Sequence, residues 1–325
     1  MHAIDQTVDP QGAFVHVDEG KGSIWHNLGH AIKKGASPEE IRQAASLAWD
    51  VKLASVKFDI DDRFEGLDND HNVMYRGDTN QVLDIVGKGY VPHQNDEVLE
   101  FFAEYIAAGN MYIDTAGSLQ GGNIIFVQAK LGKDFDLGGV DKLQSRVLLM
   151  NPHQYGKGMI AKLIDQRVVC WNTLQIALSE GGKSVHIPHI KKFDKARRDE
   201  AKRNLGIAQE RIDALHHDVE LLSKLKLGTD GALPLLIKVF DGKDKQPLEQ
   251  QGRTINRLME LYQGAGIGAK MVTAQGTGWG LLNAVTQYYD HEYGRTAESR
   301  VNYTVLGVGD IKKREMMKEL LSVAA

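Results

Sequence analysis

The sequence contains one cysteine, Cys170, among 325 residues. A single thiol cannot form a disulfide within the chain, which fits a protein of a reducing compartment. No apolar run approaches the roughly 18 residues of a membrane-spanning helix. The opening residues MHAIDQTVDP lack the basic and apolar regions of a secretory signal. We therefore expect a cytoplasmic protein that does not associate with membranes.

An excess of basic residues is also missing, since 39 Lys and Arg stand against 43 Asp and Glu, for a net charge of -4. Proteins that bind nucleic acid by charge alone are usually basic. A local basic surface is still compatible with this net charge, because a ligand meets the field of one face. The 42% hydrophobic and 25% charged residues are typical of a globular protein.

The order of the predicted elements indicates an α+β fold. We expect an antiparallel sheet of several hairpins with covering helices, followed by a mainly helical C-terminal region. The domain organisation that we predict is a flexible N-terminal arm at 1–22, an α+β core at 23–188 and a helical region at 189–325. Strands are predicted by alternation and by turn residues at 52–58, 73–92 (turning at Gly77-Asp78), 111–131 (turning at Gly121-Gly122) and 145–169.

Helices are predicted from caps and apolar periodicity. Ser37 is a good N-cap, Pro38 suits the first helical position and Glu40 completes a capping box, so a helix is predicted over 37–51. Apolar residues spaced as heptads, from Leu205 to Leu222, predict a long helix that packs on a neighbouring helix. Further helices are predicted from Asn95, over 170–182, within 248–266, over 279–289 and over 312–325.

Motifs of known chemistry are absent or incomplete. EGGKSVH at 180–186 lacks the first glycine of a phosphate-binding loop, and it follows a predicted helix where that loop follows a strand. The glycine-rich stretch 264–280 predicts a flexible or close-packed loop, or else a nest of backbone amides for a phosphate. No histidine has a matched Cys, Asp or Glu beside it, and Cys170 lies between apolar residues as a buried thiol does. We therefore predict no cofactor, no metal and no catalytic set.

Basic and aromatic residues are what remains. Trp171 could stack on a base, with Tyr155 as a weaker candidate. Asn172 and Thr173 would cap the helix predicted at 170–182 and bond a phosphate at its N-terminus. Stacking combined with backbone charge is what sequence-tolerant binding of a single strand requires. The residues that would neutralise phosphates are Lys157, Lys162, Arg167, Lys183, Lys191, Lys192, Arg197 and Arg198.

Four elements of the sequence resemble a known family, the phage- and plasmid-associated proteins of domain-of-unknown-function family 932. They are IWHNLG (24–29), NPHQYG (151–156), RVVCWNTLQIAL (167–178) and GTGWGLLNAVTQYYDH (276–291). The sequence departs from the family pattern at Gln154, where an acid is usual. The resemblance implies a mobile-element protein, located in the host cytoplasm if phage-encoded, but it implies no activity. A sheet with covering helices and a basic helical region also gives a weaker analogy to the RecT and Red-beta single-strand annealing proteins.

The leading hypothesis is a phage or mobile-element recombination protein that binds single-stranded DNA, anneals complementary strands and works as a homo-oligomer. Annealing would need no covalent chemistry. One alternative is a metal-dependent enzyme acting on nucleic acid or nucleotide, with His26, His30, His153 or Asp290-His291 as ligands. The other is an oligomeric structural or host-interaction protein that binds through the heptad helix.

Overall fold

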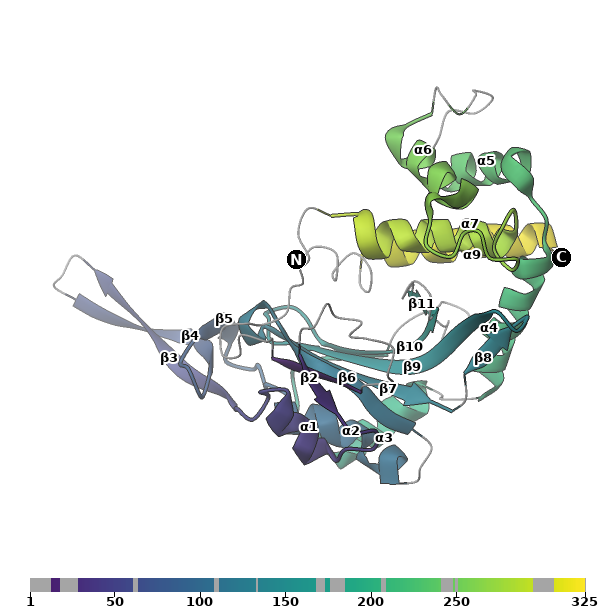
Figure 1. The fold of residues 1–325 in the computed structure, drawn as a ribbon. Helices are drawn as coiled ribbons and strands as arrows, with labels where there is room; N and C mark the ends of the chain where they lie inside the picture. Colours follow the sequence, from purple (N-terminus) through teal and green to yellow (C-terminus); the bar gives the residue numbers. More distant parts are fainter. Residues whose placement is uncertain are drawn as a thin grey trace.

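The computed structural model describes residues 13–17, 29–60, 64–107, 111–132, 134–167, 173–175, 185–205, 209–240, 248, 251–294 and 307–324. These residues form an α+β fold, which confirms the predicted fold class (Figure 1). A large sheet occupies the centre, a small three-stranded sheet projects from it, and the C-terminal part is helical.

The large sheet has the strand order β11-β10-β9-β7-β6-β1-β2, with β12 beside β10 and β8 beside β9. Its strands pair antiparallel among the described residues, apart from the parallel pair of β1 and β2. The hairpins β6–β7 and β9–β10 confirm two predictions. The strands are β1 (Phe14–Val17), β2 (His30–Ile32), β6 (Met111–Leu119), β7 (Ile124–Leu131), β8 (Phe135–Leu137), β9 (Asp141–Pro152), β10 (Met159–Arg167), β11 (Thr173–Gln175) and β12 (Val185–Ile187).

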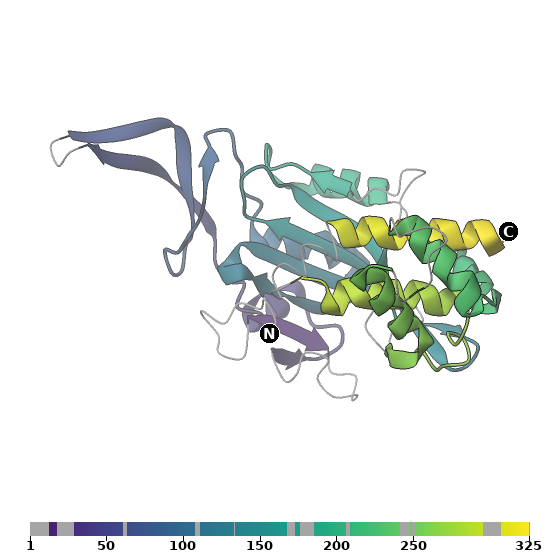
Figure 2. The same cartoon turned by 90° about the horizontal axis from the view of Figure 1, so that it is seen from above.

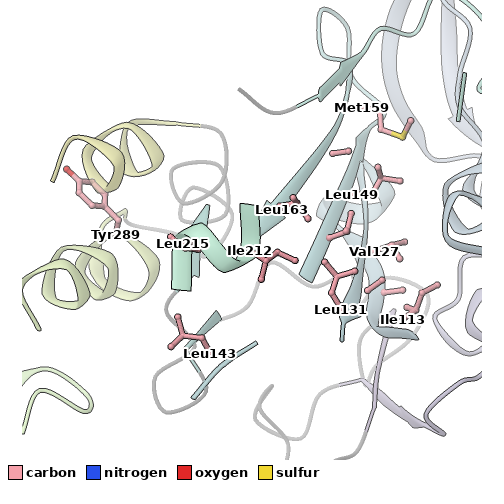
Figure 3. Close-up of a cluster of buried hydrophobic side chains, with 14 of the residues drawn as sticks. Ile113, Val127, Leu131, Leu143, Leu149, Met159, Leu163, Ile212, Leu215 and Tyr289 are labelled. Atoms are coloured by element: carbon pink, nitrogen blue, oxygen red, sulfur yellow. The ribbon is translucent and has the colours of Figure 1, made fainter. Parts of the chain in front are cut away.

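Both faces of the large sheet carry buried side chains. Successive side chains of a strand point to opposite faces. Val147 and Leu149 of β9 join the main buried cluster, while Leu148 and Met150 join a smaller cluster on the other face. Figure 3 shows the main cluster, in which strand residues meet side chains of the C-terminal helices. This cluster continues from the sheet into the helical region.

Helices α1 (Pro38–Ala44), α2 (Asn95–Ala107) and α3 (Lys195–Leu205) lie below the sheet in Figure 1. The predicted capping box is present, since Ser37 and Glu40 bond each other's backbone. The helix is shorter than the predicted 37–51. Ser46 has a φ of 55°, in the left-handed region, and this ends the helix before Trp49.

The small sheet forms an arm that extends away from the body of the molecule (Figures 1 and 2). It consists of β3 (Val51–Ile60), β4 (Phe64–Arg76) and β5 (Val82–Gly87), in the order β3-β4-β5. The turn between β4 and β5 begins at Gly77, as predicted. A register shift between Ser55 and Val56 interrupts the pairing of β3 with β4.

The C-terminal helices pack on one another and on the sheet. The predicted heptad positions Ile212, Leu215, Val219 and Leu222 are buried, which confirms the apolar seam from residue 212 on. The predicted long helix corresponds to α4 from Gln209 onward, and residues 206–208 lie outside the described residues. The structure also has α5, which the sequence did not predict. The helices are α4 (Gln209–Lys224), α5 (Gly228–Val239), α6 (Arg253–Glu260), α7 (Gly278–Gln287) and α9 (Val308–Ala324), with π-helical turns at Leu261–Ala265 and Tyr288–Glu292.

Candidate functional site

Exposed basic residues gather at the end of the sheet where β9 turns into β10. A Cβ atom at Gly158 would lie 2.9 Å from the carbonyl oxygen of Ile187, so this turn touches the end of β12. We call the surface formed by Tyr155, Lys157, Lys191, Lys192 and Arg197 the basic end. The three lysines are exposed, the Tyr155 side chain is 67% exposed and Arg197 is partly exposed.

Backbone contacts fix the basic end to the segment before α2 and to the arm. The carbonyl oxygen of Lys191 lies 3.1 Å from Nε2 of His93. The amide of Tyr155 donates to Asp84 of β5 at 2.8 Å. Asp194 caps α3 by accepting a bond from the Arg197 amide at 3.0 Å. The lysine side chains are thus carried on an anchored backbone and point into solvent.

Arg198, which was predicted to bind phosphate, is mostly committed to the protein itself. Its guanidinium lies 3.1 Å from Glu100 of α2 and donates to the carbonyl oxygen of Phe193 at 2.9 Å. The side chain is 17% exposed. Arg198 therefore joins α3 to α2 and adds little free charge to the basic end.

Arg167 is buried, and this corrects its predicted exposure to phosphate. Its Nε donates to both carboxylate oxygens of Asp141, at 2.9 and 2.8 Å. The indole of Trp279 donates to the same carboxylate at 3.1 Å, and the Thr273 hydroxyl does so at 3.2 Å. The RVVCWNTLQIAL and GTGWGLLNAVTQYYDH elements thus meet at Asp141, which binds the end of the sheet to the start of α7.

Lys162 is buried on the opposite face of β10 from Arg167, so it too is absent from the basic end. Its ammonium lies 3.6 Å from Asp310 of α9, and that carboxylate also pairs with Arg314. Burial lowers the pKa of Lys162, and the charge of Asp310 opposes this shift. Asp290, in the second of those two elements, pairs with Lys313. These ion pairs hold α9 against β10 and against the π-helical turn that follows α7.

The predicted helix at 170–182 is wrong over residues 173–175. Thr173 begins the strand β11, which pairs antiparallel with residues 164–166 of β10. Thr173 therefore does not cap a helix that could bind a phosphate. Trp171, Asn172 and Lys183 lie outside the described residues.

The NPHQYG element contributes to a buried histidine cluster, formed by His93, His153 and His189. The rings of His93 and His189 lie 4.2 Å apart between centroids, and Nε2 of His153 lies 3.4 Å from the Asn95 side-chain oxygen. Burial lowers the pKa of His93 to about 4 and those of His153 and His189 to about 3. The cluster is therefore neutral near pH 7 and serves packing at the base of the arm.

The described residues contain no group of three His, Cys, Asp or Glu arranged to hold a metal ion. His153 and Asp290, named in the metal hypothesis, have different partners. His153 contacts Asn95, whereas Asp290 pairs with Lys313. His26 lies outside the described residues. Within the described part of the chain, no helix is long and apolar enough to cross a membrane.

The partners of the buried charges were not found from the sequence. Asp141 and Asp310 carry no local signal, because each meets its cation only through the tertiary fold. The same holds for Asp165, which lies 2.9 Å from His216 across 51 residues of sequence. The sequence signal for such a pair is a charged residue at a buried position of an apolar strand, as in β10. A buried charge needs a partner.

Comparison of the sequence with known protein families identifies one family. The family described as "Domain of unknown function (DUF932)" matches residues 82–306, more than half of the chain. The protein therefore belongs to this family, and three of the four sequence elements that indicated it lie within the matched residues. No curated protein matches the chain, and no solved structure matches it.

Proposed function

We propose that the protein binds single-stranded DNA at the basic end, as a mobile-element recombination protein that anneals complementary strands. The observation that carries this proposal is the contact between the turn at Gly158 and the end of β12. This contact brings the segment of Tyr155 and Lys157 near the segment of Lys191 and Lys192, and it supports a shared surface with an exposed aromatic ring and exposed ammonium groups. Such a surface can stack on bases and neutralise phosphates at once.

The interface proposed here is smaller than the one predicted from the sequence, because Lys162 and Arg167 are buried. The basic end offers three exposed lysines and Arg197. We expect about three to four phosphate contacts, with a slope of log affinity against log salt of about -2 to -3. Stacking on Tyr155 would add about 1 to 3 kcal/mol for one base. This combination favours modest, sequence-tolerant binding of a flexible strand.

Reversing the charge of Lys191→Glu/Lys192→Glu is expected to weaken binding of a labelled single strand by about tenfold or more, and to flatten the salt slope by about 2. The reason is the loss of two phosphate contacts and the gain of two repulsions. Fluorescence anisotropy measures both quantities. Lys142→Glu/Lys224→Glu is the matched control, because both lysines are exposed away from the basic end. Equal losses in both double variants would refute the location of the site.

We also propose that the arm carries the self-association of the protein. Exposed large apolar side chains concentrate on the arm sheet: Phe58 is 48% exposed, Leu67 53%, Val82 57% and Ile85 50%. Phe58 pairs with Gly66, so Phe58 and Leu67 point to opposite faces of the arm. Exposed apolar side chains on a projecting element are typical of a protein-binding surface. The arm strands β3 and β5 also present open edges, to which a second copy could add strands.

Phe58→Ser/Leu67→Ser is expected to reduce the mass of the particle measured by light scattering at a fixed protein concentration, because it removes apolar contact between copies. The control is Ile311→Ser/Val323→Ser, which changes two comparably exposed residues of α9. A wild-type protein that is monomeric, or an arm variant with the wild-type mass, would contradict the role of the arm.

A further inference from the structure

A cavity of about 330 Å³ opens between the sheet and α4, at the other end of the β9–β10 hairpin from the basic end. Its wall includes Asp134, Phe135, Ser145, Ile212 and His216. This volume is at the lower end of small-molecule sites. The site is independent of the nucleic-acid surface proposed above.

His216 is held in one orientation at the wall of this cavity. Its Nε2 lies 2.9 Å from a carboxylate oxygen of Asp165, which is fully buried. The ring of Phe135 stacks on the imidazole, with centroids 4.0 Å apart and planes at 10°. Because a carboxylate only accepts, Nε2 carries the ring proton. Among the described residues, none bonds the remaining nitrogen, Nδ1.

Ser145 completes the support of the carboxylate. Its hydroxyl donates to the second oxygen of Asp165, directly across the β9–β10 pair. Both oxygens of Asp165 are thus engaged, and the carboxylate is fixed. The hydroxyl bonds the acid and not the imidazole, so Ser145 is not arranged as a nucleophile activated by His216.

We propose that the cavity is a hydrolytic site in which His216 acts as a general base and Asp165 positions it. Nδ1 takes a proton from a bound water while the water oxygen forms a bond to the acyl carbon of an ester. The ester C–O bond then breaks, and the proton passes from His216 to the departing oxygen. An imidazole held by a carboxylate through one nitrogen and open through the other suits this proton transfer.

The wall of the cavity selects the class of substrate. The carboxylate of Asp134 lines the cavity, while its partner Lys130 does not. No Lys or Arg of the described residues lines it either. An anionic phosphodiester would meet repulsion here, whereas Leu131, Phe135 and Ile212 offer apolar contact to a small uncharged acyl ester.

The test is hydrolysis of p-nitrophenyl acetate by the full chain. His216→Gln is expected to lower kcat/KM by about 10²-fold or more, and His217→Gln, on the exposed neighbouring residue, to leave it unchanged. Asp165→Asn should lower kcat with little change in KM. Ser145→Ala removes one hydrogen bond to Asp165 and should lower kcat by less than His216→Gln does. No burst of released nitrophenol should precede the steady state.

Ile212→Trp leaves both residues of the dyad in place and fills the cavity, and it should abolish hydrolysis even if His216→Gln fails to fold. A wild-type rate equal to that of buffer, or an equal loss in the His216 and His217 variants, would overturn the proposal. Faster hydrolysis of bis(p-nitrophenyl) phosphate than of the acetate would overturn the substrate class. Single-strand binding should be unchanged in His216→Gln, which separates this site from the basic end.

Discussion

Replacing Asp141 by alanine is expected to lower the free energy of unfolding by about 3 to 5 kcal/mol. Asp141 is 1% exposed, and it accepts bonds from Arg167, Trp279 and Thr273. Without the carboxylate, the buried guanidinium loses its counter-charge and the indole loses its acceptor. Urea unfolding followed by far-ultraviolet circular dichroism measures the effect, because Trp279 fluorescence would itself change at this site.

Two further variants make this prediction specific. Asp59→Ala removes an exposed carboxylate on the arm and should change the free energy of unfolding by less than about 0.5 kcal/mol. Asp141→Leu/Arg167→Met removes both charges, and it should be less destabilised than the sum of the single variants. If Asp141→Ala costs no more than Asp59→Ala, the contact between the two sequence elements does not hold the fold together.

The second large effect is a loss of stability in mild acid. Burial lowers the pKa of His93 to about 4 and those of His153 and His189 to about 3, while an unfolded histidine titrates near 6.5. Between these values the unfolded chain binds more protons than the folded chain. The stability is therefore fully present above pH 6.5 and is lost as the pH falls towards the folded values.

Each buried histidine should contribute about 2 kcal/mol less at pH 5 than at pH 7.5, and the three together about 4 to 6 kcal/mol. That is comparable with the whole stability of many domains. His189→Phe keeps a ring between Tyr90 and His93 and should reduce the proton uptake on unfolding by about one. The exposed-site control, His217→Asn, should leave the pH dependence unchanged. A wild-type stability that is flat from pH 7.5 to 5 would contradict the buried, neutral cluster.

Local signals in the sequence predicted elements well where the determining contacts are local. The capping box of Ser37 and Glu40, the glycine turn at 121 and the apolar face of α4 each depend on neighbours within a few residues. The end of α1 was missed because it depends on a left-handed conformation at Ser46, and a serine gives no sequence signal for that conformation. α5 was missed because Gly228 and Pro234 read as loop signals.

The residues of the candidate sites were harder to predict, because charge alone does not say which side of a sheet a residue faces or what it meets there. Lys162 and Arg167 were taken as surface cations, and the structure buries both against carboxylates from α9 and β9. Thr173 was assigned to a helix, since a short apolar run does not distinguish strand from helix, and its pairing with β10 is non-local. Lys157, Lys191 and Lys192 lie in loops between elements, where exposure is the rule.

Binding of a labelled single strand, compared with a duplex of the same sequence, tests the central claim most directly. Fluorescence anisotropy at about 50 and 200 mM salt gives the affinity and its salt dependence. The basic end predicts tighter binding of the single strand, weakening by about 20- to 60-fold between the two salt concentrations. No binding at the lower salt, or equal affinity for the duplex, would contradict the proposal that this protein binds single-stranded DNA.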